Sequence, residues 1–563
     1  METTNKSPFS ERTWLPLAWI IAASALAHLW CLGSVFYLDD YVQIVHNKKL
    51  VTGEFWTSGL TAWTQFWYAV QYRLFGISGP GFHAVNWLLH TAAACVLFAF
   101  GRDFLGDRAR WRVALFGAVL FAVHPLGSEI PNYARSQDLA WVTLFSLLAA
   151  WAMLRFLKDG GWMKLMACVL CVLGATFSKG PGIFHVAMAT GVVGLAFVTR
   201  DHLKMFRRHL WLIAALAVLI LVPLWMSGGI AAFLNGLRSF GQPRFIGNAY
   251  TLGRVFWEFA WRTVVPVSLS ADHHIAETIV RPGMHFWNVP DPGAMWAAAG
   301  FVAVTLFSGF LAWSRSTRLF GVCFLLFCST ILFRVLYPIP EFMPEYRIYP
   351  GLPWFCLGAA ILLHAALRKL TEIPPRVPAV ILVAGFVFLS ARRSFVWHDL
   401  HRLLGDVLQQ YPTQARAVWE QDERDVDEGK WQDIITRQRT VWPEVFRRFM
   451  EENQRIAPAR ELPTGHFALA ETACRGAYAL ALAHTEGADA GLREINQQEI
   501  YMKRLGLDPV AHALHWGYFF YNKAMVLEVV GQHEAAIALL ERDEVPRIGK
   551  QALTRLKEKG SAR

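Results

Sequence analysis

The chain has 563 residues, of which 54% are hydrophobic and only 17% are charged, and its mean hydropathy is +0.30. Soluble proteins carry about 25% charged residues, so this composition excludes a protein that is soluble along its whole length. The net charge of +11 comes from basic residues in short loops rather than on one surface, which argues against nucleic-acid binding and for a membrane protein.

Apolar runs fill the chain as far as residue 395. A membrane-spanning helix needs about 20 apolar residues, and eleven segments approach this length. We therefore expect an all-α fold, in which residues 1–395 form a polytopic transmembrane bundle and residues 396–563 form a soluble helical domain. The predicted spans are residues 14–37, 82–105, 111–123, 139–157, 162–177, 182–199, 210–230, 294–313, 319–336, 352–367 and 377–389.

Basic residues are concentrated in every second loop between these spans. Four arginines lie within residues 102–112, for example, whereas the alternate loops contain few basic clusters. The positive-inside rule then places the N-terminus in the cytoplasm, and an odd number of spans places the C-terminal domain on the other side. The first apolar run is longer than the core of a signal peptide, which is about 7–15 residues, so we interpret it as an uncleaved span.

Charged residues gather in the outer loops, close to helix ends. Charges at membrane depth are costly and are usually functional or paired. The outer loops supply the acidic pair directly after the first span and a lysine that stands alone in a short connection between two apolar helices. The charged and histidine residues on this face are Asp39, Asp40, His124, Glu129, Arg135, Asp138, Lys179, Glu345 and Arg347.

This set fits the transfer of a sugar from a polyprenyl-phosphate donor. Such a reaction needs a carboxylate that deprotonates or orients the acceptor and cations that hold the leaving phosphate. Asp39 and Asp40 are the candidate catalytic residues; the alternative is a solvated pair at a helix end. The candidate phosphate-binding residues are Arg135, Lys179 and Arg347. A snorkelling lysine and a structural arginine–glutamate pair are the alternatives for the last two.

Other polar residues of the outer loops are assigned supporting or acceptor-binding roles. These candidates are His124, Glu129, Asp138, Glu345, Asp272 and His273. Whether the site binds a divalent metal ion remains open, although adjacent residues such as Asp272 and His273 do not converge easily on one ion. The long outer loop, residues 231–293, contains aromatic residues at helical spacing around Trp257 and Trp261, which predicts a helix that lies along the membrane interface.

The C-terminal region has the pattern of helical hairpins. Residues 511–542 predict two helices joined at Gly531, and the alanines of the second helix permit close packing against the first. A weaker copy covers residues 477–495, with Gly487 at the turn. This pattern resembles a tetratricopeptide repeat, whose period is about 34 residues. We expect a tetratricopeptide-like domain that binds an acceptor or another partner and does not carry the catalytic residues.

Several segments, taken in order, resemble the transmembrane and tetratricopeptide-repeat O-mannosyltransferases, which are glycosyltransferases of the GT-C class. The segments are FYLDDYVQIVHN (36–47), FHAVNWLLH (82–90), FAVHPLGSE (121–129), ARSQDL (134–139), SKG (178–180), PVSLSADH (266–273), EYRIYP (345–350) and WHD (397–399). The resemblance implies a polyprenyl-phosphate monosaccharide as donor, with transfer on the non-cytoplasmic face and inversion at the sugar carbon. It also implies that an acid of the first outer loop is the base, and Asp39 occupies the first position of that pair.

Two other classes of function remain as alternatives. A polytopic lipid or sugar transporter or flippase often has internal repeats and charges near the membrane midplane, whereas the charges here gather on one face. A membrane-anchored scaffold would use the C-terminal domain alone. For the enzyme, we expect three partners: a lipid-linked sugar as co-substrate, a protein or glycan acceptor, and membrane lipids. We expect a bacterial inner (plasma) membrane, with the active site and the C-terminal domain on the periplasmic face.

Overall fold

The computed structural model describes residues 14–106, 111–202, 229–238, 243–273, 291–336, 343–370, 376–412, 414–447, 466–504 and 513–542, with a few isolated positions besides. Every regular element in these ranges is a helix, in agreement with the predicted all-α class. Contacts between helices divide the chain into two compact units. The first contains Met1–Ala271 and Ile275–Leu400, and the second contains Asp272–His274 and His401–Arg563.

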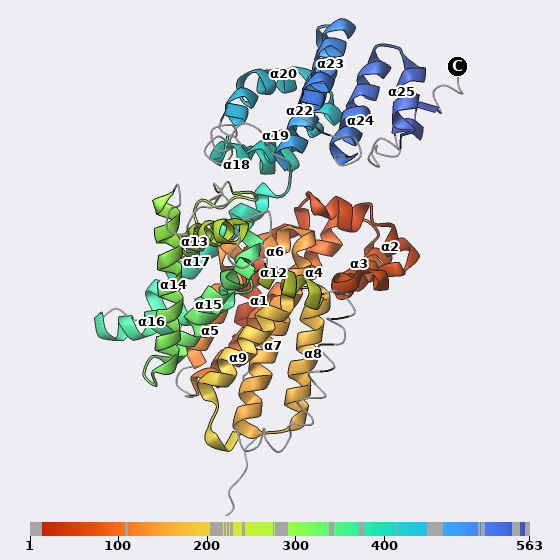
Figure 1. Ribbon diagram of the computed structural model, residues 1–563. Helices are drawn as coiled ribbons and strands as arrows, with labels where there is room; N and C mark the ends of the chain where they lie inside the picture. Colours follow the sequence, from red (N-terminus) through yellow and green to blue (C-terminus); the bar gives the residue numbers. More distant parts are fainter. Residues whose placement is uncertain are drawn as a thin grey trace, which may run out of the picture. The chain divides into compact units, whose positions relative to one another are not determined.

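The first unit is a bundle of α-helices, shown in red to teal in Figure 1. They are α1 (Trp14–His28), α2 (Lys48–Thr52), α3 (Ala62–Phe75), α4 (Gly79–Leu105), α5 (Trp111–Val123), α6 (Glu129–Asn132), α7 (Gln137–Asp159), α8 (Trp162–Ser178), α9 (Gly182–Phe197), α12 (Gly229–Arg238), α13 (Pro243–Val264), α14 (Pro292–Trp313), α15 (Arg318–Leu336), α16 (Leu352–Leu370) and α17 (Arg376–Val396). Short 3-10 or π-helical turns occupy Leu29–Gly33, Tyr41–Val45, Glu54–Thr61, Pro125–Gly127, Ala134–Ser136 and Glu345–Ile348.

Among the residues that the structure describes, five helical segments are long and apolar enough to cross a membrane: Trp14–Gly33, Gly79–Leu105, Ala134–Asp159, Pro292–Trp313 and Val377–Val396. A bent pair, Trp111–Val123 with Pro125–Asn132, gives a sixth candidate, and four shorter apolar helices coincide with other predicted spans. The predicted span at residues 210–230 lies outside the described residues, apart from isolated positions. The chain is therefore a membrane protein with several apolar helices, and the number of eleven spans stays a prediction.

Small residues allow the helices of the bundle to approach one another closely. Helix α7 packs against α4, α8 and α9, and α5 packs between α4 and α16. At Gly117 in α5, a Cβ atom would lie 3.1 Å from the backbone of Leu357 in α16, so a larger side chain would push these two helices apart. Close contact through small residues is the usual way in which membrane helices pack, because hydrophobic burial gives little net driving force in lipid.

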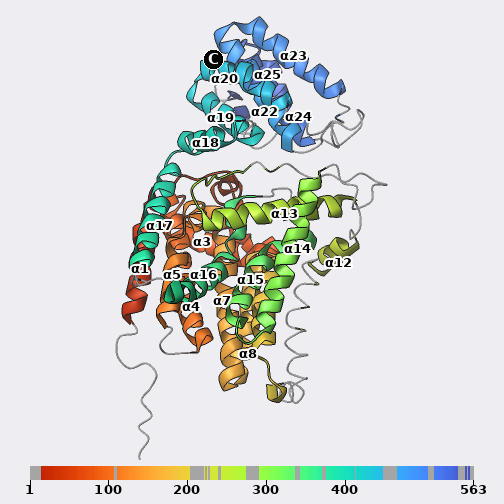
Figure 2. The same ribbon diagram turned by 90° about the vertical axis from the view of Figure 1, so that its left-hand side faces the viewer.

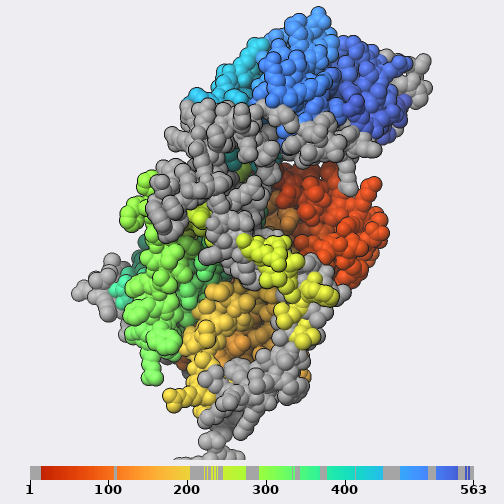
Figure 3. Space-filling model, in the orientation of Figure 1, coloured from red at the N-terminus to blue at the C-terminus, as the bar shows by residue number. Residues whose placement is uncertain are grey.

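The segment between α1 and α4 folds into a lobe beside the bundle. It contains α2 and α3, and it forms the red surface in Figure 3. Asn47 caps the N-terminus of α2 by accepting a hydrogen bond from the Lys49 amide at 3.1 Å. On the bundle side, the Tyr68 hydroxyl of α3 contacts the carbonyl oxygens of Ala134 and Arg135, each at 3.2 Å. The lobe is thus tied to the segment that carries one of the predicted cations.

The predicted helix in the long outer loop is observed as α13, which crosses one end of the bundle (Figure 2). Its buried face includes Val255 and Phe259, whereas Trp257, Trp261 and Val264 are exposed. The Trp257 indole donates a hydrogen bond to the Ala297 carbonyl at 2.9 Å, which fixes α13 to α14. The exposed apolar side chains agree with an interfacial helix, and the depth of these residues in a membrane stays a prediction.

The second unit consists of helical hairpins, shown in teal to blue in Figure 1. Its helices are α18 (Leu400–Gln410), α19 (Ala415–Glu428), α20 (Trp431–Thr440), α22 (His466–Thr485), α23 (Ala488–Arg504), α24 (Ala513–Val529) and α25 (His533–Leu540). The α24–α25 pair matches the predicted hairpin, and α22–α23 matches the weaker one. Gly429, Gly487 and Gly531 make the three hairpin turns with φ values of +69°, +103° and +84°, a conformation that favours glycine.

Candidate active site

The acidic pair lies in a turn that the backbone makes just after the first apolar helix. Leu38 has a φ of +46°, in the left-handed region that a leucine rarely occupies. Within the part of the chain that the structure describes, the exposed Asp39 carboxylate accepts no hydrogen bond and forms no ion pair. The strained turn therefore presents this carboxylate to solvent or to a ligand.

Asp40 is fully buried and has a different environment. Its Oδ2 accepts a hydrogen bond from the Tyr37 amide at 2.9 Å, and its Oδ1 accepts one from the Arg135 amide at 2.6 Å. Burial raises the pKa of Asp40 to about 8, although the two amides act in the opposite direction. Asp40 is thus mostly protonated near neutral pH and joins the acidic turn to the segment that contains Arg135, which leaves Asp39 as the available carboxylate.

The next group of charges is organised around Asp138 in the first turn of α7. Its Oδ2 accepts hydrogen bonds from Arg135 Nη1 at 2.5 Å and from Lys179 Nζ at 2.8 Å. Its Oδ1 accepts one from the Leu139 amide at 2.6 Å, and the carboxylate has no exposed surface. One buried acid therefore fixes two of the three predicted cations, both of which keep about a fifth of their side-chain surface exposed.

Lys179 is placed by the tight connection between α8 and α9. Helix α8 ends at Ser178, whose carbonyl oxygen accepts a hydrogen bond from the Thr64 hydroxyl of the lobe at 2.9 Å. A Cβ atom at Gly182 would overlap the carbonyl oxygen of Ala175, so the start of α9 can approach α8 only with glycine there. Burial lowers the pKa of Lys179 to about 8, whereas Asp138 raises it.

The third predicted cation, Arg347, lies in the 3-10 turn Glu345–Ile348. Its guanidinium carbon is 5.6 Å from the centre of the Tyr346 ring, and Lys179 Nζ is 5.5 Å from the same centre. Both distances are within the range of a cation–π interaction. Arg135, Lys179 and Arg347, which come from three separate connections between helices, therefore gather around Asp138 and Tyr346.

Two of the predicted supporting acids hold the backbone around this group. Glu129 Oε2 accepts a hydrogen bond from the Tyr346 amide at 2.7 Å, and Glu345 Oε1 accepts one from the Ser270 amide at 2.7 Å. Glu129 reaches Tyr346 because the helix that contains it bends by 54° at Pro125, where the missing N–H interrupts the helical hydrogen bonds. These hydrogen bonds fix the backbone beside the cations, and the acceptor-binding role of Glu129 and Glu345 stays a prediction.

Lys179 and Arg347 line a pocket of about 350 Å³, a volume that includes the open space at its mouth. Its other lining residues are Leu139, Pro181, Gly182, His185 and Arg334. Arg334 was not among the residues chosen from the sequence. It is 2% exposed and lies in α15, whose first fifteen residues form an apolar helix. An arginine in such a helix is costly, and this cost was the signal that could have identified it.

The remaining predicted residues lie elsewhere. His124 is buried, and both ring nitrogens are engaged: Nδ1 accepts from the Leu126 amide at 3.2 Å, and Nε2 contacts the Thr263 carbonyl at 2.9 Å. Asp272 and His273 group with the second unit, in which His273 Nδ1 contacts the Tyr411 hydroxyl at 2.8 Å. Among the described residues, no three His, Cys, Asp or Glu side chains are arranged to hold a metal ion.

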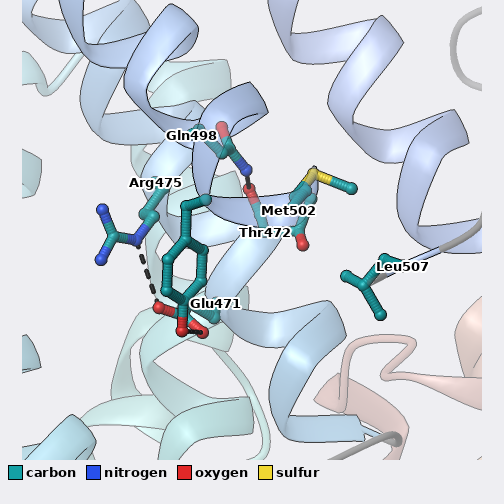
Figure 4. Close-up of a pocket in the computed structure, with 7 residues that line it drawn as sticks. Glu471, Thr472, Arg475, Gln498, Met502 and Leu507 are labelled. Carbon is teal, nitrogen blue, oxygen red and sulfur yellow. Dashed lines mark hydrogen bonds and ion pairs between the residues drawn. The ribbon is translucent and has the colours of Figure 1, made fainter. Parts of the chain in front are cut away.

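The second unit has a smaller pocket between α22 and α23, with a volume of about 210 Å³ (Figure 4). Glu471 contacts Arg475 at 3.2 Å and the Tyr501 hydroxyl at 3.2 Å, and the Arg475 guanidinium lies 4.9 Å from the centre of the Tyr501 ring. Gln498 donates a hydrogen bond to the Thr472 carbonyl at 2.7 Å. The charges of Glu471 and Arg475 compensate each other in this pocket. It therefore lacks the excess of cationic side chains that lines the pocket of the first unit.

Sequence comparison identifies relatives with printed functions, although no family model matches the chain. A protein O-mannosyl-transferase of Caenorhabditis elegans is 25% identical over 422 residues, which cover 70% of this chain and 58% of the relative. The protein O-mannosyl-transferase Tmtc1 of Drosophila melanogaster is 28% identical over 189 residues, which cover 30% of this chain and 22% of the relative. The chain thus spans less than two-thirds of either protein. These matches confirm the resemblance to the transmembrane and tetratricopeptide-repeat O-mannosyltransferases.

Proposed function

We propose that this protein is a membrane glycosyltransferase that transfers a monosaccharide from a polyprenyl-phosphate donor to a protein acceptor. The relatives are protein O-mannosyltransferases, which makes mannose the first sugar to test and a hydroxyl the acceptor group. We place the reaction on the non-cytoplasmic face, because the candidate residues come from the loops that lack basic clusters. The periplasmic face of a bacterial inner membrane, a bundle of eleven spans and a tetratricopeptide-like acceptor-binding domain belong to the same proposal.

The observation that carries this proposal is the hydrogen bond between Asp40 Oδ1 and the Arg135 amide. It joins the acidic turn to the residue that shares Asp138 with Lys179. This hydrogen bond thereby fixes the turn that carries the proposed base, Asp39, relative to the proposed phosphate-binding cations. A donor reacts only when the acceptor and the leaving group are positioned together, and a fixed arrangement of this kind removes much of the entropic cost.

In the proposed reaction, Arg135, Lys179 and Arg347 bind the phosphate of the donor. The Asp39 carboxylate accepts the proton of the acceptor hydroxyl as the hydroxyl oxygen attacks the anomeric carbon. The bond between that carbon and the phosphate oxygen breaks, and the cations stabilise the charge that develops on the leaving polyprenyl phosphate. Attack on the side opposite to the phosphate inverts the configuration at the sugar carbon.

The direct test replaces the proposed base without changing its size. Asp39→Asn is expected to abolish sugar transfer while donor affinity stays within about twofold, because the cations that bind phosphate are unchanged. Glu54→Gln is the matched control, since Glu54 is an exposed acid of the same outer segment and has no proposed role. Transfer would be measured with purified protein, labelled polyprenyl-phosphate mannose and an acceptor peptide, without vesicles, so that transport cannot substitute for turnover. Parental activity in Asp39→Asn would refute the assignment.

A further inference from the structure

Four aromatic side chains form a continuous series beside the candidate active site. The ring centres of Tyr37 and Tyr133 are 6.1 Å apart, and those of Tyr133 and Tyr346 are 5.8 Å apart. Trp397 packs against Tyr37 and Tyr133 at 5.7 and 5.9 Å. Tyr37, Tyr133 and Trp397 are 2%, 4% and 0% exposed, whereas Tyr346 is half-buried. Tyr346 is therefore the member of this series that a bound molecule can reach.

The ring of Tyr346 is close to two of the cations and also packs against an aromatic residue near the acidic pair. Lys179 and Arg347 approach its centre to within 5.6 Å. Its centre is 5.8 Å from that of Tyr133, which interacts electrostatically with both Asp39 and Asp40. The hydrogen bond from the Tyr346 amide to Glu129 fixes the backbone from which the Tyr346 ring projects. A molecule that is bound by Lys179 and Arg347 therefore lies close to this ring.

We propose that Tyr346 contacts the sugar ring of the donor and contributes to the choice of sugar, an inference that rests on the proposed function. The sugar is bonded directly to the phosphate, so a phosphate at Lys179 and Arg347 places the sugar beside Tyr346. The C–H groups on one face of a pyranose carry partial positive charge, and the face of an aromatic ring carries partial negative charge, so the two surfaces attract. Axial hydroxyl groups block one face of a sugar ring, so sugars that differ in their axial hydroxyls differ in the face that can stack on Tyr346.

A purely structural role for Tyr346 makes a different prediction. If the ring only holds Lys179 and Arg347 in place, its loss weakens the binding of every polyprenyl phosphate, with or without a sugar. If the ring contacts the sugar, its loss weakens only the sugar-bearing ligand. The comparison therefore uses two probes of equal chain length, polyprenyl-phosphate mannose and polyprenyl phosphate, and measures the affinity of each for the full-length protein.

In Tyr346→Leu, we expect about fivefold to tenfold weaker binding of polyprenyl-phosphate mannose, and binding of polyprenyl phosphate within about twofold of the parent. Tyr72→Leu is the matched control, because Tyr72 lies on α3 and has no proposed role, and it should bind both ligands as the parent does. Equal weakening of both ligands in Tyr346→Leu would overturn the proposal. Failure of the parent to bind either ligand would instead count against the proposed function.

Tyr346→Phe provides a second test that preserves the ring and its packing. The preference for the mannose-bearing ligand over polyprenyl phosphate should remain within about twofold of the parental value, because the aromatic face is retained. Complete loss of that preference would show that the ring face does not carry it. Polyprenyl-phosphate glucose is the third probe, and we expect Tyr346→Leu to discriminate less between mannose and glucose than the parent. Unchanged discrimination would also contradict the proposal.

Discussion

The two units of the molecule both bury charged side chains, but they balance them differently. In the second unit, Arg437 donates hydrogen bonds to two buried acids, Asp422 and Asp425, so one cation serves two carboxylates inside the fold. In the first unit, one buried acid, Asp138, serves two cations that remain partly exposed beside a pocket. Burying charge stabilises a fold only when partners compensate it. The enclosed network is suited to stability, whereas the partly open one is suited to binding an anion.

The largest expected effect tests whether the enclosed network of the second unit stabilises the fold. Arg437→Ala removes the cation between two buried carboxylates and should destabilise the second unit by about 3–5 kcal/mol, because the acids are left without a counter-charge. Thermal unfolding of the full chain in detergent would measure this change, and donor affinity should not move. Arg439→Ala is the control: its ion pair with Glu486 is about half exposed on both sides and should contribute less than about 1 kcal/mol. Equal stability of the two variants would contradict the distinction.

The next effect tests the binding half. In Lys179→Ala, Asp138 keeps its hydrogen bonds from Arg135 and from the Leu139 amide, so the protein should fold with little loss of stability. Donor affinity should fall by about 1.5–3 kcal/mol, the value of a hydrogen bond to a charged group. Isothermal titration with polyprenyl-phosphate mannose would measure it. Unchanged affinity in Lys179→Ala would remove this residue from the phosphate site, and loss of the folded state would make its role structural.

The smallest effect uses pH. The pKa of Lys179 is lowered to about 8 by burial, so this cation is charged below pH 8 and loses its charge as the pH rises through that value. Donor binding that requires the charged form should therefore weaken about tenfold between pH 7 and pH 9. The Asp40 carboxyl, whose pKa is also raised to about 8, titrates in the same range. In Lys179→Arg, Asp40 is unchanged and the arginine stays charged up to pH 9. This variant should therefore lose the part of the pH dependence of donor binding that comes from Lys179. Identical pH profiles in the parent and Lys179→Arg would contradict this account.

The grouping of the cations could be predicted from the sequence, because apolar length and basic loops assign the connections that carry them to one predicted face of the membrane. Arg135, Lys179 and Arg347 are far apart in the chain and gather in the structure, whereas the face on which they lie stays a prediction. Tertiary pairing was harder to predict. Asp39 and Asp40 are chemically identical neighbours, and only the backbone turn at Leu38 separates the exposed acid from the buried one.

The same limit applies to the predicted supporting residues. Glu129 and His124 are candidates for acceptor or metal binding; the structure adds that both form hydrogen bonds with backbone groups, and their roles stay predictions. Arg334 was missed because it lies in the last turn of α15, directly after the apolar part of that helix. Tyr346 was not chosen from the sequence because aromatic residues are common in membrane proteins, and only the fold shows the charges that surround its ring. The partners of these side chains are visible only in the fold, since hydrophobic periodicity and composition do not specify tertiary contacts.

Two of the acids beside this site, Asp40 and Glu129, accept hydrogen bonds from main-chain amides. Asp40 accepts from the amide of Arg135, and Glu129 accepts from the amide of Tyr346. Every amino acid except proline offers that same donor, so these two hydrogen bonds do not depend on which side chain stands at position 135 or 346. At position 135 the side chain has a second partner in the buried Asp138. At position 346 the proposed sugar contact can be varied by substitution while the hydrogen bond to Glu129 stays in place.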